Sequence, residues 1–227
     1  HSHQFSILRN AGYGFMRNTD FEQLNLFWQS ELDLKKGKAF FNLGQNEKAF
    51  GSQNFYSTRY PHQFEETKTQ FASVGLNTYL TKNNKIRVNP RAYYRRHYDR
   101  FELFREGEGY YSRIPGGGFA SNEGDTVTWY TGHNYHRTDV YGAEISANAY
   151  SKLGVTSFGY EYRYEGVVSN ALGEDLDTPE NVVNEHPSAQ YTKAINRENI
   201  SYYLEHNFTV QNLFVSAGLM YNVNTAF

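Results

Sequence analysis

The chain has 227 residues, which is long enough for one large β domain or two small ones. Hydrophobic residues make up 39% of it, the mean hydropathy is -0.73, and no apolar run approaches the length of a transmembrane helix. A barrel strand needs apolar residues on one face only, so the low hydropathy leaves a β-barrel membrane protein open. The formal net charge of -2 provides no overall attraction to nucleic acid, and the absence of cysteine excludes disulfides and thiolate metal sites.

Apolar and polar residues alternate with a period of two over most of the chain, which predicts β-strands with one apolar and one wet face. The second predicted strand is the clearest, with Leu24, Leu26 and Trp28 on one parity and Gln23 and Asn25 on the other. Nine such strands are predicted, with lengths up to about 12–18 residues. The first two run over about residues 4–16 and 22–34, and the alternation of the other seven is clearest at 39–43, 72–80, 86–99, 141–149, 157–165, 200–208 and 213–223.

The predicted connections alternate in length. Short turns are expected at 35–37, 82–85, 152–154 and 210–212, and long loops at 50–66, 105–132 and 168–196. Only the first connection, at 17–20, is a short member of the long set. Outer-membrane barrels have short periplasmic turns and long extracellular loops, and the strands are longer than the 5–6 residues typical of globular proteins. The fold class predicted is all-β, an antiparallel transmembrane β-barrel; a soluble antiparallel β protein is the alternative.

The two parities of the strands differ in the solvent that they suit. Every backbone polar group must be paired in lipid, so the sheet has to close, and the apolar parity is expected to face the lipid. The other parity is too charged for hydrocarbon and is expected to face a wet or protein-filled lumen. Nine strands do not close in the usual even-stranded way, so we expect about nine strands of the wall of a larger barrel.

Several segments resemble the TonB-dependent outer-membrane receptors of Bacteroidetes, in particular their cobalamin-receptor-like branch. The strongest is YRRHYDRFELF at residues 94–104, continued by HNYHRTD at 133–139. The others are GFMRNTDFE at 14–22, EKAFG at 47–51, FY at 55–56 and QFEET at 63–67. They follow the family order across most of the chain.

The resemblance implies a barrel of about 22 strands with an N-terminal plug, which takes up a scarce nutrient using force from the TonB complex. It places residues 1–227 within the barrel domain, with the plug domain and the remaining strands absent. Localisation in the bacterial outer membrane is implied, with membrane lipid, the plug, the TonB complex, a corrinoid ligand and a surface lipoprotein as partners. No cofactor is implied.

Two groups of residues are candidates for function. One is a charged group on the expected lumen face, consisting of Arg87, Arg91, Arg95, His97, Glu144 and Glu161. It is interpreted as a lumen ion-pair network, with contact to an anionic ligand group or to acidic plug residues as the alternative. The other is a set of aromatic residues in the long loop 105–132: Tyr110, Tyr111, Phe119, Trp129 and Tyr130. These either close over a flat ligand or form an aromatic girdle at the outer interface.

Other motifs are weaker. The acidic run of Glu174, Asp175, Asp177 and Glu180 lacks the regular spacing of a calcium loop and is interpreted as solvated. Alternation places His133 and His136 on opposite faces, which argues against a shared metal. Residues 116–118, three glycines, lack the lysine of a phosphate loop and indicate a flexible loop. Tyrosines and arginines at 93–100 alternate between faces, whereas a nucleic-acid surface needs them together.

No arrangement in the sequence supports catalysis, because there is no cysteine nucleophile, no G-x-S-x-G elbow and no metal-ligand spacing. The function expected is nutrient uptake by a receptor barrel, with a corrinoid as the ligand and the long loops contributing to its capture. An iron chelate or an oligosaccharide is the alternative ligand. Outside this class, the alternatives are a barrel that does not transport and a soluble β-sandwich binding module.

Overall fold

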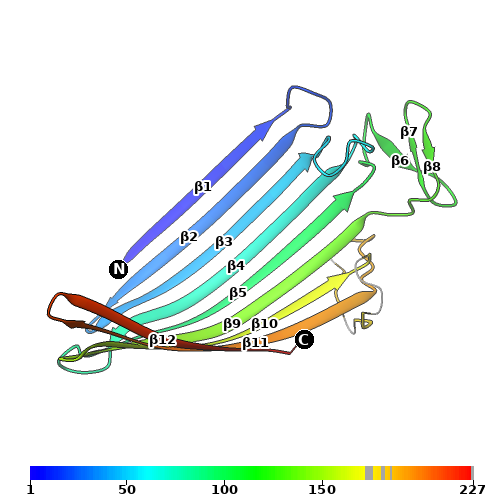
Figure 1. Ribbon diagram of the computed structural model, residues 1–227. Coiled ribbons are helices and arrows are strands. Elements are labelled where there is room, and N and C mark those ends of the chain that lie inside the picture. The colour runs from blue at the N-terminus through cyan, green and yellow to red at the C-terminus, as the bar shows by residue number, and fades with distance from the viewer. Residues whose placement is uncertain (172–175, 180–181, 185, 226–227) are drawn as a thin grey trace.

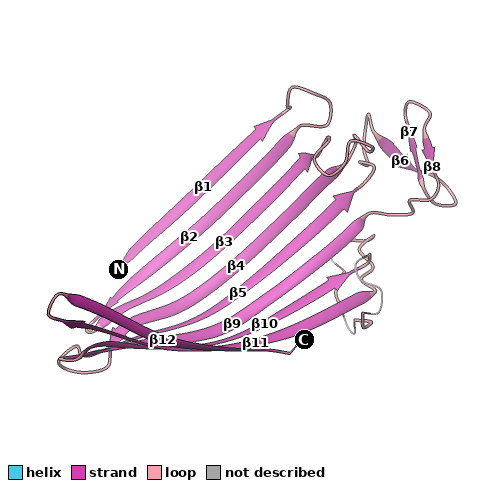
Figure 2. Ribbon diagram, in the orientation of Figure 1, coloured by secondary structure: helices cyan, strands magenta, loops and turns pink. Residues whose placement is uncertain are grey.

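The computed structural model describes residues 1–171, 176–179, 182–184 and 186–225. All of the regular structure in these residues is β-strand (Figure 2), and they contain no helix long and apolar enough to cross a membrane. Nine long strands form one antiparallel sheet in the order β1-β2-β3-β4-β5-β9-β10-β11-β12. The predicted all-β class and the nine long strands are therefore confirmed.

Each long strand pairs with its neighbour in the chain, so the sheet is a meander. The strands are β1 (Ser2–Gly12), β2 (Phe21–Leu34), β3 (Gly37–Gly51), β4 (Phe64–Tyr79), β5 (Ile86–Glu102), β9 (Asn134–Ser151), β10 (Gly154–Ser169), β11 (Lys193–Val210) and β12 (Leu213–Asn224). Figure 1 shows a broad, curved sheet whose long connections all leave from one end of the strands and whose short turns lie at the other. We call these the loop end and the turn end.

The strand limits differ from the prediction at one place. The first strand ends at Gly12, not at residue 16, because Gly14 and Asn18 adopt positive φ angles of 75° and 60° that end the extended backbone. The first connection is therefore the loop 13–20 rather than a four-residue turn. The third strand reaches Gly51, close to the predicted start of the long loop at residue 50, since it pairs with β2 and β4 along its whole length.

The long connection between β5 and β9 contains a second, small sheet that the sequence analysis did not predict. It consists of β6 (Tyr111–Arg113), β7 (Phe119–Ser121) and β8 (Thr126–Val127) in the order β6-β7-β8. Four buried aromatic side chains, Phe104, Tyr111, Phe119 and Tyr130, form its core. We call residues 103–133 the loop domain.

The nine-stranded sheet is a single layer. The described elements contact only their neighbours within the two sheets, so no second layer covers the long strands. Large apolar side chains therefore stay exposed along the strands, for example Ile7, Trp28, Ile145 and Leu204. Exposed apolar surface on this scale requires a partner or an apolar solvent.

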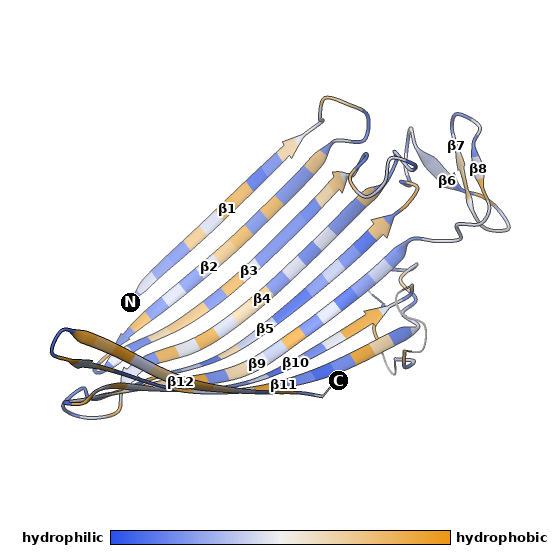
Figure 3. Ribbon diagram, in the orientation of Figure 1, coloured by the Kyte–Doolittle hydropathy of each residue, from blue (hydrophilic) through white to orange (hydrophobic). Residues whose placement is uncertain are grey.

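The two faces follow the alternation in the sequence, as the colours along each strand in Figure 3 show. Residues that pair across strands share a face. One such row contains Phe5, Trp28, Leu43, Ala72, Tyr94, Tyr141 and Tyr164. The opposite face carries the row of Arg91, Glu144 and Glu161. We call these the apolar face and the charged face.

The short turns are displaced in regular steps along the sheet. The residue pairs that close them are Leu34 with Gly37, Leu80 with Ile86, Ser151 with Gly154, and Val210 with Leu213. Leu34 is in register with Gly37 on β3 and, through it, with Thr78 on β4, and the second turn closes at Leu80, two residues beyond Thr78. Ile86 is in register with Ala149 on β9, and the third turn closes at Ser151, two residues beyond Ala149.

The fourth turn repeats the step. Ala149 is in register with His206 on β11, and the fourth turn closes at Val210, four residues beyond His206. The third turn closes two residues beyond this same row, so the fourth is displaced by a further two residues. A step of two residues for every two strands is one residue per strand. With about 3.4 Å per residue and about 4.8 Å between strands, this stagger corresponds to a strand tilt of about 35°, within the range of barrel walls.

Glycine is required where β3 begins beside β4. A Cβ added to Gly37 would lie 1.9 Å from the backbone oxygen of Asn77, whereas one added to Gly218 in β12 would find its nearest atom at 3.6 Å. A clash with backbone cannot be relieved by a rotamer change. We therefore expect Gly37→Ala to lower the free energy of unfolding by roughly 1–3 kcal/mol, and Gly218→Ala to leave it unchanged. Thermal unfolding followed by circular dichroism in detergent measures both variants; equal effects would contradict the close approach.

Candidate functional site

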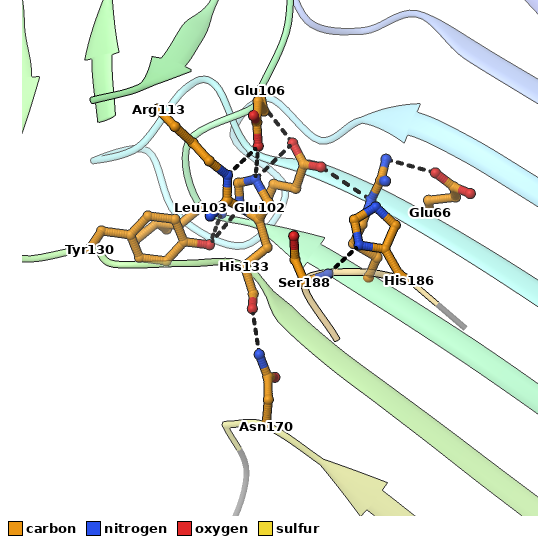
Figure 4. Close-up of polar contacts among 11 residues, drawn as sticks. Glu66, Glu102, Leu103, Glu106, Arg113, Tyr130, His133, Asn170, His186 and Ser188 are labelled. Carbon is orange, nitrogen blue, oxygen red and sulfur yellow. Dashed lines mark hydrogen bonds and ion pairs between the residues drawn. The ribbon is translucent and has the colours of Figure 1, made fainter. Parts of the chain in front are cut away.

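The polar chemistry of the molecule concentrates at the loop end, where β5 and β9 enter and leave the loop domain. A directional chain of hydrogen bonds connects the two strand ends (Figure 4). The backbone NH of Leu103 donates to the hydroxyl oxygen of Tyr130 at 3.2 Å, and that hydroxyl donates to Nδ1 of His133 at 3.2 Å. Nε2 of His133 donates to Glu106 at 3.0 Å, which assigns the ring proton to Nε2.

Two further contacts extend this chain into a network. The backbone NH of Glu106 donates to a side-chain oxygen of Glu102 at 2.7 Å, and Arg113 forms an ion pair with Glu106 at 3.1 Å. The carbonyl oxygen of His133 accepts a bond from Asn170 at 2.9 Å. The network therefore holds the loop domain, the end of β5 and the start of the connection after β10 in one arrangement.

Burial controls the protonation of this network. It lowers the pKa of His133 to about 4 from 6.5, so the imidazole is neutral at neutral pH. Burial also raises the pKa of Tyr130 to about 12, which keeps its hydroxyl proton available for donation. Burial alone would raise the pKa of Glu106, but the bond from His133 and the charge of Arg113 hold it below its usual value. Each group is therefore in the form that its hydrogen bonds require.

A second group of contacts joins the loop domain to the first connection. Arg105 makes paired bonds to the carboxylate of Asp20, at 2.6 and 2.8 Å, and a third bond to Asn18. The hydrogen bonds from Arg105 lower the pKa of Asp20. Arg17, in the same first connection, forms an ion pair with Glu123 of the loop domain. The loop domain is thus fixed at two places rather than at a single hinge.

An open hollow of about 590 Å³ lies between the loop domain and the connection 52–63. It is lined by Arg59, Tyr60, Phe104, Tyr111, Asp125, Thr126, Val127 and Trp129. Trp129 is 62% exposed and its ring centre lies 6.2 Å from that of Tyr60. Its aromatic side walls, with the cation of Arg59 and the anion of Asp125 beside them, suit a flat, amphipathic ligand.

The five aromatic residues predicted in this loop divide between two roles. Tyr111, Phe119 and Tyr130 are buried in the core of the loop domain, so they stabilise it rather than present a surface. Tyr110 is half-buried against Arg17 and Arg105, which lie 5.3 and 4.6 Å from its ring centre. Trp129 is the member of the set that offers its ring to solvent. Tyr60 was missed, because it lies in a different connection.

The charged group predicted on the strands lies on one face, and part of it is connected. Arg91 pairs with Glu144 at 3.0 Å, and Glu161 accepts a bond from the hydroxyl of Tyr93 at 2.6 Å. His97 bonds to Thr69 at 2.8 Å. Within the described part of the chain, Arg87 and Arg95 form no ion pair. The pair of Arg197 with Glu165 on the same face was not anticipated.

The weaker motifs have simple structural roles. His133 and His136 bond to different partners, Glu106 and Ser169, and no group of three potential metal ligands occurs among the described residues. Residues 116–118 adopt positive φ angles in the turn between β6 and β7. Of the acidic run, Glu174, Asp175 and Glu180 lie outside the described residues, and Asp177 forms a backbone bridge to Ala194.

A comparison with models of protein families, with curated proteins and with solved structures finds no match to this chain. The geometry of the chain itself is therefore what supports a function.

The neutral state of His133 makes the loop domain sensitive to acid. The folded pKa of about 4 lies below the unfolded value of 6.5, so its contribution to stability is complete above pH 6.5 and is lost as the pH falls towards 4. We expect the rate of proteolysis within residues 103–133 to rise roughly tenfold between pH 6.5 and pH 5. The measurement is limited proteolysis over this range with an acid-tolerant protease.

The matched variants are His133→Gln, which removes the titrating group, and His206→Gln at the turn end, which keeps it. His133→Gln should raise proteolysis at neutral pH and flatten its rise on acidification. An unchanged acid profile in His133→Gln would show that another group controls the opening of the loop domain.

Proposed function

We propose that the chain forms part of the wall of an outer-membrane barrel in a TonB-dependent receptor, and that its loop end contributes to capture of cobalamin or a related corrinoid. The observation that carries this proposal is the single-layer sheet with one apolar and one charged face, staggered by one residue per strand. A β-sandwich packs two sheets face to face, and here no described element covers either face of the long strands.

The height of the apolar face supports a membrane setting. On β5 this face runs from Ile86 through Val88 and Ala92 to Tyr94, and the next residue on the same face is Arg96. The eight residue-to-residue steps from Ile86 to Tyr94, at about 3.4 Å each and a tilt of about 35°, give a height of about 22 Å, close to the apolar band of about 25 Å in outer-membrane barrels. Tyr94, Tyr141 and Tyr164 lie side by side at its upper limit, as expected at a membrane interface.

The charged face suits a lumen that holds water or a plug domain. Its polar side chains bond to one another across neighbouring strands, for example Asn42 with Ser73 and Asn89 with Ser146 at 3.1 Å each. Pairing of this kind is common inside barrels and is costly in hydrocarbon. Arg87 and Arg95 are the cations on this face best placed to contact an acidic group of a plug.

The ligand class rests on two supports. One is the resemblance of the segments at 14–22, 94–104 and 133–139, which all lie at the loop end of the sheet. The other is the hollow beside Trp129 and Tyr60, whose aromatic side walls suit a flat ring system. Transport itself requires the plug and the TonB complex, which act through the rest of such a receptor.

The orientation of the two faces is tested with single cysteines, since the chain has none of its own. We expect a spin label at Val74→Cys or Ile145→Cys, both exposed on the apolar face, to be reached by oxygen, which concentrates in lipid, and labels at Asn89→Cys or Ser146→Cys by a water-soluble nickel chelate. The measurement is power-saturation EPR on outer-membrane vesicles from producing cells. Equal access of the nickel chelate to all four positions would exclude the membrane wall.

Ligand capture is tested at the hollow. We expect Trp129→Ala and Tyr60→Ala each to weaken cobalamin binding by about tenfold, from loss of about 1.4 kcal/mol of ring stacking. Phe55→Ala is the matched control, because Phe55 is an exposed aromatic residue of the same connection that does not line the hollow. Binding is measured by calorimetry, and the absence of binding to the unmodified protein redirects the assignment to an iron chelate or an oligosaccharide.

A further inference from the structure

The apolar face is not uniform, and its main irregularity lies on β4. In the row that contains Trp28, Leu43, Ala72 and Tyr94, the alanine is much the smallest side chain. A slot of about 410 Å³ opens above it, flanked by the rings of Trp28 on β2 and Tyr94 on β5. Three strand spacings of about 4.8 Å separate these flanks, which leaves room for an extended hydrocarbon chain.

The slot ends towards the loops at a pair of amides. Gln45 and Gln70 occupy the next row on the same face, and the side chain of Gln70 donates to that of Gln45 at 2.9 Å. Both residues line the slot, so its walls change from apolar to polar within one row. A lipid molecule shows the same change in polarity, from its apolar acyl chain to its polar headgroup.

A second, polar hollow continues directly from the amide pair. It measures about 360 Å³ and is lined by Glu66, Lys68, Gln70, Tyr98, Asp99, Arg100, Tyr135, His136, His186, Ala189 and Tyr191. Gln70 belongs to both hollows, and Lys68 and Glu66 are the next residues of β4 on the same face. Part of the connection after β10 covers it, with His186 stacked on Tyr135 at 5.1 Å.

We propose that the slot and the hollow together bind one glycolipid of the outer leaflet, with an acyl chain over Ala72 and a phosphorylated sugar headgroup beside Lys68 and Arg100. The proposal rests on the membrane setting proposed above. Tyrosine, histidine and amide groups provide partners for sugar hydroxyls. Both cations have carboxylate partners, Lys68 in Glu47 at 2.8 Å, and Arg100 in Glu66 at 2.7 Å and Glu102 at 3.1 Å. The Lys68 side chain is 40% exposed, so its pair is weak and exchanging Glu47 for a phosphate costs little.

The side of the sheet identifies the kind of lipid. The polar hollow is at the loop end, where the long connections of a barrel face the outside of the cell. The outer leaflet there consists of glycolipids with phosphorylated sugars, and a hollow that carries both charges and several hydroxyl and amide groups matches such a headgroup.

The experiment measures the glycolipid that stays bound to detergent-purified full chain after extensive washing, by fatty-acid and phosphorus analysis with mass spectrometry. We expect one glycolipid per chain in the unmodified protein and loss of most of it in Ala72→Phe, which fills the slot. Ala143→Phe is the matched control, because Ala143 is an exposed alanine on the same face outside both hollows. Equal retention in Ala72→Phe and Ala143→Phe, or retention of phospholipid alone, overturns the proposal.

The headgroup contact is tested separately. Lys68→Gln should reduce the retained glycolipid severalfold, whereas Lys48→Gln, on the charged face at about the same height, should leave it unchanged. A second readout separates failure of this proposal from failure of the membrane setting. Trp129→Phe leaves Trp28 as the single tryptophan, and its fluorescence reports brominated acyl chains in reconstituted vesicles.

If Trp28 is quenched but no glycolipid is retained, the chain lies in a membrane and the lipid site is disproved. If Trp28 is not quenched, the membrane wall itself is disproved, and the lipid site with it. Quenching together with glycolipid retention that depends on residues 68 and 72 supports both.

Discussion

The structure depends on one constraint: a β-sheet one layer thick is stable only where its two faces meet different surroundings. The backbone of the nine long strands is hydrogen-bonded from strand to strand, so the side chains alone decide what each face contacts. Period-two alternation sends Trp28 and Tyr94 to one side and Arg91 and Glu144 to the other. In water, the apolar side would be an extended surface prone to aggregation. An apolar solvent on that side removes this cost without a second layer.

The constraint also explains how much of the fold can be predicted from sequence. A side-chain period of exactly two shows itself over any long strand, and so the nine strands and their faces follow from the pattern at Leu24, Leu26 and Trp28 and its repeats. The ends of the strands are less certain, because Tyr13 and Phe15 continue the alternation while Gly14 and Asn18 break the backbone. The alternation pattern describes the side chains, whereas the backbone φ angles determine where a strand ends.

The loop domain could not be predicted from the sequence, for a related reason. Its strands have three, three and two residues, which is too short for a period to be visible. Aromatic residues in a loop of this length are equally compatible with a core and with a ligand surface. Only the contacts of Phe119 with Tyr130 and of Phe104 with Tyr111 show that they bury one another. The same limit applies to Tyr60, whose partner Trp129 is far away in sequence.

The two ends of the sheet have different structural roles. At the turn end, short connections and a constant step keep the strands at one tilt, and the step leaves little freedom for the register to slip. At the loop end, the same strands extend beyond the apolar band, and their side chains become ionic, as Arg96 with Asp139 and Arg100 with Glu66 show. The buried chain from Tyr130 through His133 to Glu106, together with the pair of Arg105 and Asp20, gives the loop domain a fixed position. For the ligand capture proposed above, a sheet that ends in a firmly held loop domain would present a preformed surface, and binding to such a surface costs less ordering entropy than binding to a mobile loop.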